Sequence, residues 1–125
     1  MLRVRTCLGK SEIPGAGIGL FAAEDIPRGA VIWQRDEGFD LVIDEADWPP
    51  GVPDDFLRFY GFSPAGAGRY VVCLDNARFM NHSRTPNGVG DRETVAARDI
   101  KAGEELTEDY RNLCHPEHLA TMGFI

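Results

Sequence analysis

The sequence has few cysteines, a minority of basic residues and no long hydrophobic run. Its three cysteines, Cys7, Cys73 and Cys114, are odd in number and far apart, so they predict neither a disulfide framework nor a CxxC metal knuckle. No apolar stretch approaches the ~20 residues that span a bilayer, and the N-terminus lacks the apolar run of a signal peptide. We therefore expect an intracellular protein without membrane association, cytoplasmic, or nuclear in a eukaryotic cell.

The shortage of basic residues excludes one class of partner. Thirteen Lys and Arg against twenty Asp and Glu give a net charge of −7. Nucleic-acid binding draws its affinity chiefly from neutralised phosphates, so direct binding of nucleic acid is not expected. A basic, Lys-rich protein or peptide suits the charge. The eight acidic residues from Asp36 to Asp55, with no Lys or Arg among them, are either a solvated face or a negatively charged wall that orients such a partner.

Length and pattern predict one mainly β domain, of the α+β type with little helix. The 125 residues, 43% of them hydrophobic, suffice for a single domain with a modest core. Apolar alternation and short apolar runs dominate the chain. The expected strands cover residues 2–8, 31–33, 40–44, 70–74 and 94–97.

One helix is expected, at residues 56–60, with Asp54 or Asp55 as its N-cap. The loop at 48–53 precedes it and a flexible connector at 61–68 follows. Within the single domain at 1–125, residues 36–69 are expected to form a variable acidic insert. Residues 111–125 are expected to be a short C-terminal tail.

A weak repeat suggests how the strands are arranged. The pattern Ala-Ala-x-Asp-Ile-x-x-Gly occurs at residues 22–29 and again at 96–103. Each copy predicts a strand, a Gly-closed turn and a returning strand. Two copies of this strand-turn-strand unit suggest two small sheets that face each other. Chance similarity is the alternative for so short a match.

Three blocks carry the candidate site. They are residues 15–22 (GAGIGLFA), 75–87 (DNARFMNHSRTPN) and 103–110 (GEELTEDY). The alternate glycines of the first block let the backbone approach a ligand closely, although alone they fit a plain hairpin. Leu20 stands where a dinucleotide fingerprint requires its third glycine, which disfavours a Rossmann-type methyltransferase. The second block alone predicts tight turns.

Taken together and in this order, the blocks resemble the SET family of protein lysine methyltransferases over residues 15–110. The run RFMNHS with the following Pro-Asn, and ELTxDY behind it, is a specific match. The resemblance implies a β-clip of small sheets with a C-terminal pseudoknot. It also implies S-adenosyl-L-methionine as the cofactor, which enters from the face opposite the substrate lysine and meets it in a narrow channel.

The same resemblance implies roles for five residues around the cofactor. The backbone of Ala16, Gly17 and Ile18 would bind its methionine part. Asn81 and His82 would hold its amino group and adenine. The plainer interpretations are turn capping for Asn81 and a core histidine bonded to backbone for His82.

Tyr110 corresponds to the active-site tyrosine, a fixed hydroxyl dipole beside the transferring methyl group; otherwise it is an ordinary strand aromatic. Tyr70 or Tyr60 is nominated as a second channel tyrosine. Glu108 stands where the family usually has Phe or Tyr in the lysine channel. A carboxylate there would raise the pKa of the substrate ammonium, so we expect Glu108 to slow catalysis, bind a different amine or point elsewhere.

Three further expectations concern side chains outside this set. Arg78 is expected to pair with Glu104 or Glu105 across the crossing strands. No metal is expected, because Cys114, His115 and His118 lack a fourth ligand and the cysteine cluster of a zinc-binding post-SET module is missing. Phe124 is a candidate for closing the channel.

Two functions follow as hypotheses. The first is an S-adenosylmethionine-dependent lysine methyltransferase that acts on a basic protein. The second is a catalytically weak or inactive SET module that binds a protein partner, suggested by Glu108 and by the short tail.

Overall fold

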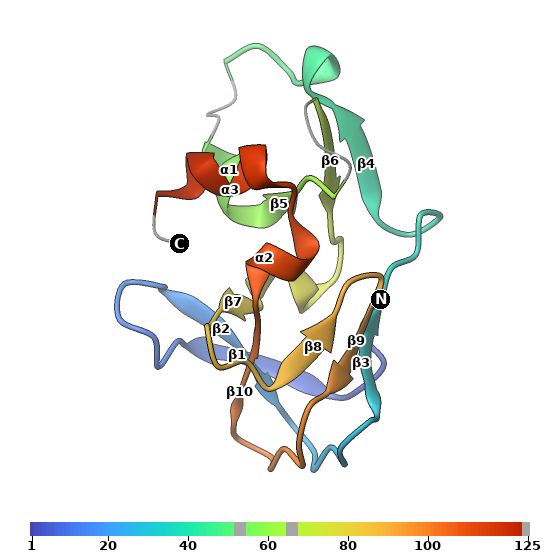
Figure 1. Cartoon of the computed structure of the whole chain (residues 1–125), viewed down its shortest axis with the longest axis vertical. Helices are drawn as coiled ribbons and strands as arrows, with labels where there is room; N and C mark the ends of the chain where they lie inside the picture. Colours follow the sequence, from blue (N-terminus) through green and yellow to red (C-terminus); the bar gives the residue numbers. More distant parts are fainter. Residues whose placement is uncertain (52–54, 65–67, 124–125) are drawn as a thin grey trace.

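The computed structural model describes residues 1–51, 55–64 and 68–123. Within these ranges the chain forms short strands in three sheets and three short helices (Figure 1). The strands are β1 (Thr6–Lys10), β2 (Ile18–Ala22), β3 (Val31–Gln34), β4 (Leu41–Asp44), β5 (Gly61–Phe62), β6 (Arg69–Val72), β7 (Asn81–His82), β8 (Gly88–Gly90), β9 (Glu93–Ala96) and β10 (Glu105–Glu108). The helices are α1 (Asp55–Tyr60), α2 (Tyr110–Leu113) and α3 (Pro116–Met122), with 3-10 turns at η1 (Glu45–Asp47) and η2 (Asn76–Phe79). The predicted cap Asp54, parts of the predicted loop and connector, and Phe124 lie outside the described residues.

The last strand brings the three sequence blocks together. One sheet has the order β1-β2-β10-β7, in which β10 is antiparallel to β2 and parallel to β7. Leu106 of β10 lies opposite Leu20, and Glu108 lies opposite His82. The other sheets have the orders β3-β9-β8 and β4-β6-β5. Because β10 lies between β2 and β7, the third block contacts both of the others.

The two copies of the repeat pair with each other. Ile26 and Ile100 exchange both backbone hydrogen bonds, each of 2.8 Å, and in Figure 1 the two turns lie side by side at the lower end of the molecule. Four further hydrogen bonds form two reciprocal pairs between the copies. In the first pair, Gly29 N donates to Ala96 O and Gly103 N donates to Ala22 O. In the second pair, Arg28 N donates to Asp99 Oδ1 and Ala102 N donates to Asp25 Oδ1. Each copy therefore gives its first strand to one sheet and its returning strand to the other, so the repeat joins two sheets.

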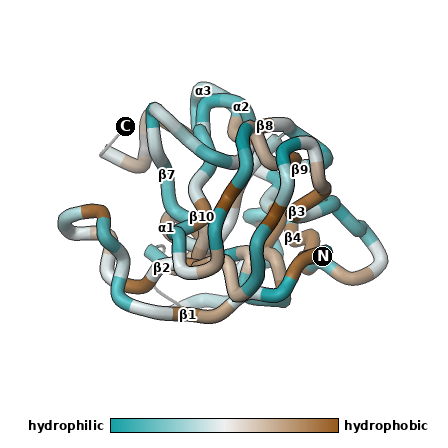
Figure 2. The backbone as a smooth tube through the Cα atoms, turned by 90° about the horizontal axis from the view of Figure 1, so that it is seen from below, coloured by the Kyte–Doolittle hydropathy of each residue, from teal (hydrophilic) through white to brown (hydrophobic). Residues whose placement is uncertain are grey.

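The core lies where these sheets meet. Its buried members are Leu20, Ala22, Ile26, Ile32, Trp33, Cys73, Met80, Ala96, Ile100 and Leu106. Figure 2 shows short hydrophobic stretches in the strands between hydrophilic turns. Since alternate residues of a strand point to opposite faces, Leu106 and Glu108 share the face of β10 that is turned toward this core. That register places an acidic side chain at the edge of the core.

The C-terminal segment corrects the expectation of a single helix. Helices α2 and α3 follow Asp109, and a second small core of Leu113, Cys114 and Met122 packs beneath them. The His115 side chain accepts from Glu117 N, Pro116 occupies the first turn, and Gly123 ends α3 with φ +73°. None of the helices in the described ranges has the length and apolar character needed to cross a bilayer.

Two strands differ from the expected ones by more than one residue. The strand predicted over residues 2–8 is divided, because Leu2 forms an isolated bridge with Trp33 and β1 begins only at Thr6. The buried strand predicted over residues 70–74 ends at Val72. Both differences leave the sheet positions of the three blocks unchanged.

Candidate cofactor and substrate site

Asn81 and Tyr110 line one cavity of about 640 Å³, so these two side chains, far apart in sequence, border a common space. The other lining residues are 13–18, Phe59, Tyr60, Arg78, Phe79 and His82. All three sequence blocks contribute to the walls or to the strands behind them. The volume lies in the range typical of small-molecule and cofactor sites.

The glycines of the first block have two different functions. Gly15 and Gly17 adopt φ +79° and +75°, and a Cβ at either position would meet nothing within 4 Å. These two are required for their backbone conformation. Gly19 is required for space, because a Cβ there would lie 2.4 Å from Glu105 Oε1. The first block therefore fits closely against a buried carboxylate of β10.

That carboxylate, Glu105, is a site residue whose position the sequence did not reveal. Its side chain is 8% exposed and accepts three hydrogen bonds: from Ser11 Oγ at 2.7 Å, from Glu12 N at 2.8 Å and from Asn81 Nδ2 at 3.1 Å. Glu105 thus joins the glycine block to Asn81 and fixes the orientation of the Asn81 amide. The period-two pattern of β10 was the available signal, since it turns one of the two consecutive glutamates inward.

Arg78 does not form the predicted ion pair. Its guanidinium donates to two carbonyl oxygens of the preceding turn at 3.1 and 3.2 Å. Glu104 pairs instead with Arg98 at 3.0 Å, while Glu105 is engaged in the network just described. Arg78 remains part of the site as a lining residue of the cavity.

The Asn81 amide has one free hydrogen-bonding group toward the cavity. Its nitrogen donates to Ile18 O at 2.9 Å as well as to Glu105. Its oxygen accepts no hydrogen bond from any described part of the chain. A fixed amide oxygen at a cavity wall can accept from a ligand's ammonium or amide.

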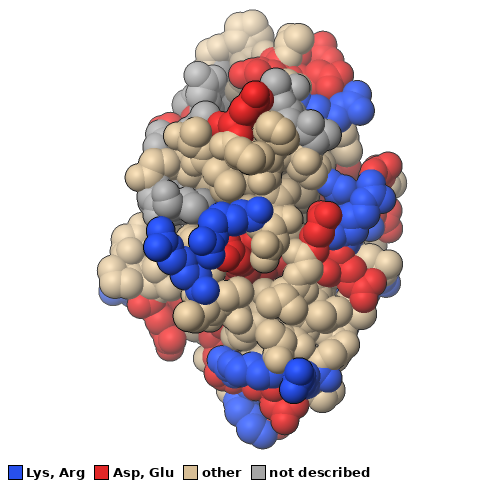
Figure 3. Space-filling model, viewed as in Figure 1, with Lys and Arg blue, Asp and Glu red and all other residues tan. Residues whose placement is uncertain are grey.

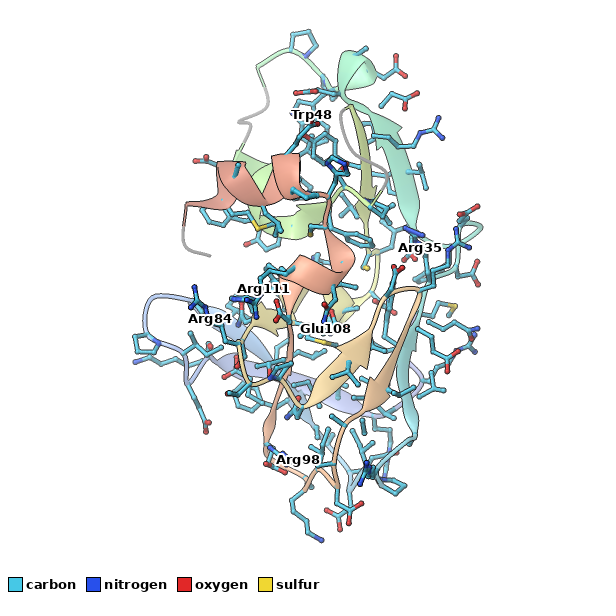
Figure 4. The ribbon with its side chains drawn as sticks, viewed as in Figure 1. Arg35, Trp48, Arg84, Arg98, Glu108 and Arg111 are labelled. Carbon is cyan, nitrogen blue, oxygen red and sulfur yellow. The ribbon has the colours of Figure 1, made fainter. Side chains whose placement is uncertain are left out.

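His82 is neutral in this setting. Its Nδ1 accepts from Tyr110 N at 3.2 Å, which places the ring proton on Nε2. Burial lowers the pKa of His82, and the nearby positive charges of Arg111 and Arg84 lower it further, against the opposing effect of Asp109. Figure 4 shows both arginine side chains together beside the C-terminal segment, and Figure 3 shows a group of basic side chains on the same face of the molecule.

Tyr110 holds a fixed, protonated hydroxyl. The hydroxyl donates to Met80 O at 2.6 Å, and burial raises the pKa of Tyr110 well above its usual value, with Glu108 and Cys114 acting in the same direction. Tyr110 therefore offers a dipole whose lone pairs are oriented by the Met80 bond, and it does not act as a base near neutral pH.

A second, narrower cavity of about 50 Å³ adjoins the first. The two share Phe59, Tyr60, Arg78 and Tyr110, and the remaining lining residues of the second are Trp33, Gly61, Phe62, Cys73, Ala77, Met80, Glu108, Leu113, Cys114 and Met122. Most of these side chains are apolar. The arrangement is a wide space and a narrow one that meet at Tyr110 and Tyr60.

Of the two tyrosines nominated for the channel, the structure places Tyr60 at this junction. Tyr70 lines neither cavity. Its ring packs edge-on against His118, with 5.3 Å between ring centroids. The strand β6 turns Tyr70 toward α3, a contact that depends on the tail helices.

Glu108 faces the narrow cavity, so of its three expected roles the one in which it points elsewhere is excluded. The side chain is 8% exposed, and Oε1 accepts a hydrogen bond from Thr94 Oγ1. Burial raises the pKa of Glu108 to about 7, although the Thr94 bond acts in the opposite direction. A carboxyl group thus lies inside a mostly apolar space.

The raised pKa of Glu108 predicts a pH-dependent stability. From about pH 4.5, its pKa in the unfolded chain, to about pH 7, the unfolded chain has released a proton that the folded chain retains, so stability falls as pH rises through this window. Glu108→Gln abolishes that dependence. We expect the variant to be more stable than wild type at pH 8 by about 1–3 kcal/mol and similar to it at pH 4.5. Urea unfolding at a series of pH values measures this, with Glu104→Gln as the exposed control; parallel curves for wild type and Glu108→Gln would contradict it.

The acidic segment is partly neutralised by arginines from outside it. Asp44 pairs with Arg69 at 3.0 Å, and Glu37 lies 3.7 Å from Arg92. Asp40 is buried and accepts from the backbone within the same turn. The segment therefore presents less uncompensated negative charge than the sequence suggested.

The cysteine and histidines of the tail have structural surroundings. Cys114 is buried in the second core, His115 caps α3, and His118 Nε2 lies 3.2 Å from Gly61 O. No group of three potential metal ligands occurs among the described residues.

Solved structures with a similar fold include chains of Polycomb Repressive Complex 2. The chain is 25% identical to a chain of the Chaetomium thermophilum Polycomb Repressive Complex 2 in an autoinhibited conformation bound to S-adenosylmethionine, with a TM-score of 0.69, covering 98% of this chain and 17% of that one. A crystal structure of that complex contains a chain that is 28% identical, with a TM-score of 0.66, and the match covers 86% of this chain and 15% of that one. A humanized mutant of the complex bound to an inhibitor contains a chain that is 29% identical, with a TM-score of 0.66, and the match covers 90% of this chain and 16% of that one. This chain spans about one sixth of the chains that it matches.

A comparison with curated proteins finds no match. The SET domain family profile matches residues 17–111. That range includes Asn81, His82 and Tyr110, and it accounts for most of the first cavity. The chain therefore belongs to the SET domain family.

Proposed function

We propose that the protein is an S-adenosylmethionine-dependent protein lysine N-methyltransferase that acts on a basic, Lys-rich protein or peptide. The observation that carries this proposal is the wide cavity lined by the glycine block, Asn81 and Tyr110, which meets a narrow, mostly apolar cavity at Tyr110. SET domains use S-adenosylmethionine, and the similar Chaetomium thermophilum structure is bound to it.

The residues of the wide cavity fit this cofactor. The backbone of residues 16–18 is accessible at two glycine-dependent turns, and the free Asn81 oxygen suits the cofactor's ammonium group. Neutral His82 suits an adenine without placing a second positive charge beside a sulfonium. When bound, the cofactor supplies an activated methyl group.

The narrow cavity suits the end of a lysine side chain. An exposed lysine has a pKa of ~10.4 and is neutral at pH 7 only about once in 2,500 molecules. Apolar walls such as Phe62 and Met80 disfavour the ammonium form, which favours the reactive amine. Tyr110 then presents its fixed hydroxyl at the junction, where the amine and the methyl group meet.

Labelled cofactor and calorimetry test the proposal. Wild-type protein should transfer label from S-adenosylmethionine to Lys-rich proteins. Asn81→Ala removes an acceptor for a charged group, which typically costs about 1.5–3 kcal/mol, so its cofactor affinity should fall about 10- to 150-fold. The exposed Asn112→Ala is the matched control and should bind as wild type does. Absence of transfer by wild type, under conditions where the cofactor binds, would contradict the proposal.

A second candidate is a SET module that binds a partner without turnover. Glu108 favours it, because a carboxylate in the narrow cavity stabilises an ammonium and so opposes formation of the amine. Saturable cofactor binding without methyl transfer to any Lys-rich protein would support this alternative.

A further inference from the structure

Glu108 is held rigidly at the end of β10. Its backbone pairs with His82 in β7, and its carbonyl accepts from Ser83 N at 2.9 Å. It directly precedes Asp109, which caps the helix that carries Tyr110. The strand therefore fixes the distance between the Glu108 carboxyl and the tyrosine junction, and Figure 4 shows the side chain near the centre of the molecule, between β8 and α2.

The Glu108 side chain extends over Gly88, where only a small residue fits. A Cβ at Gly88 would lie 3.6 Å from Glu108 Cγ and 2.8 Å from the Thr94 methyl group. Thr94, which is fully buried, donates to Oε1. Oε2 accepts no hydrogen bond from the described ranges. One oxygen is thus oriented by the protein, and the other is available to a group in the narrow cavity.

Glu108 differs in its titration from the groups that face it. These groups are Thr94 in β9, Tyr110 in α2, Cys114 directly after α2, Cys73 directly after β6 and Arg78 in η2. Burial raises the pKa of both thiols, that of Cys114 to about 12, and that of the Tyr110 phenol. Burial thus brings the pKa of Glu108 close to neutral pH, while it moves the pKa values of Tyr110 and of the two thiols further above neutral pH.

One residue that lines the same cavity has an unpaired donor. Trp33 is 4% exposed, and its Nε1 has no hydrogen-bond partner within the described structure. A buried polar group left unpaired costs about 1–3 kcal/mol, and a cavity of about 50 Å³ has room for more than one water-sized group. With a donor in Trp33 and an acceptor in Glu108, the narrow cavity is equipped for a polar occupant.

We propose that Glu108 is the general base that accepts the proton of the substrate ammonium. This inference rests on the proposed function. One N–H bond of the ammonium breaks, its electron pair stays on nitrogen, and the proton binds Glu108 Oε2 to give a neutral carboxylic acid. The nitrogen lone pair would then form the new bond to the methyl carbon while the carbon–sulfur bond breaks, and the electron pair of that bond would stay on the sulfur of the demethylated cofactor. Glu108 releases its proton to solvent when the product leaves.

The physical reason is that the apolar cavity disfavours separated charges. With a lysine pKa of ~10.4 as in water, proton transfer from its ammonium group to a carboxylate whose acid has a pKa near 7 is unfavourable by about 3 pKa units. Inside the cavity, the transfer converts two buried charges into two neutral groups, which burial favours. Before transfer, the carboxylate reduces the penalty for admitting the ammonium. A pKa near the working pH is also that of an efficient base.

The test is the pH dependence of kcat/KM for a Lys-rich peptide at saturating cofactor. Wild type should show an acid limb near pH 7. Glu108→Gln should lose about 10²–10⁴-fold at pH 7, and its deficit should shrink toward pH 10, where the free amine becomes abundant. Thr94→Val removes the bond that lowers the Glu108 pKa, so its acid limb should move to higher pH. Cofactor affinity by calorimetry should stay as in wild type for both.

The failures of the two proposals are distinguishable. If wild type transfers methyl groups while Glu108→Gln retains the wild-type rate and pH profile, Glu108 is not the base and the methyltransferase function stands. If wild type transfers none, the proposed function itself fails. If Glu108→Gln does not fold, Thr94→Val decides, and an acid limb that stays in place overturns the inference.

Discussion

Tyr110→Phe is expected to lower the rate of methyl transfer by about 10²–10³-fold, the loss typical when one fixed dipole is removed from a reaction centre. The Tyr110 hydroxyl is held by Met80 O at 2.6 Å, keeps its proton and lies at the junction of the two cavities. Phe preserves the ring and its contact with His82, so cofactor affinity should change little. Single-turnover transfer of labelled methyl groups, with calorimetry on the same samples, separates the two quantities.

Tyr70→Phe is the matched control for this prediction. Tyr70 lines neither cavity and packs against His118, so its hydroxyl should be irrelevant to the rate. Equal losses in the two variants, or a Tyr110→Phe rate near that of wild type, would show that the hydroxyl at the junction has no part in the reaction.

Glu105→Ala is expected to destabilise the fold by about 3 kcal/mol and to weaken cofactor binding. It removes the shared acceptor of Ser11 Oγ, Glu12 N and Asn81 Nδ2 in a buried setting. Breaking such a network leaves donors unpaired and opens a small cavity. Urea unfolding measures the first effect, and calorimetry with S-adenosylmethionine measures the second.

Glu104→Ala tests whether position and burial cause this loss. Glu104 is the adjacent glutamate, but its side chain is 35% exposed and pairs with Arg98 at the surface. Exposed ion pairs contribute little, so the variant should unfold and bind nearly as wild type does. If the two variants behave alike, the network around Glu105 does not organise the site.

The fold class and several residues that line the wide cavity were predictable because their signals are local. Glycines at alternate positions, the Asn-His pair and the Tyr110 block each appear as short motifs. What brings them together is the pairing of β10 with both β2 and β7. The periodicity of the chain does not indicate which strands pair, so this pairing could not be derived from it.

The errors concern contacts between segments that sequence does not relate. The true partners of Arg78 are carbonyl oxygens of its own turn, which a search for complementary charges misses. Helices of four and seven residues are too short for a clear apolar period, so the tail and its contact with Tyr70 were not foreseen. For Glu108, the period-two register with Leu106 already indicated an inward side chain.

The most direct test of the central claim is a crystal structure of the protein with S-adenosylhomocysteine, the demethylated product of the cofactor. The ligand should lie in the wide cavity, with its amino group on the Asn81 oxygen and its sulfur directed toward the junction at Tyr110. A ligand bound outside this cavity, or within it but with its sulfur directed away from Tyr110, would contradict the account.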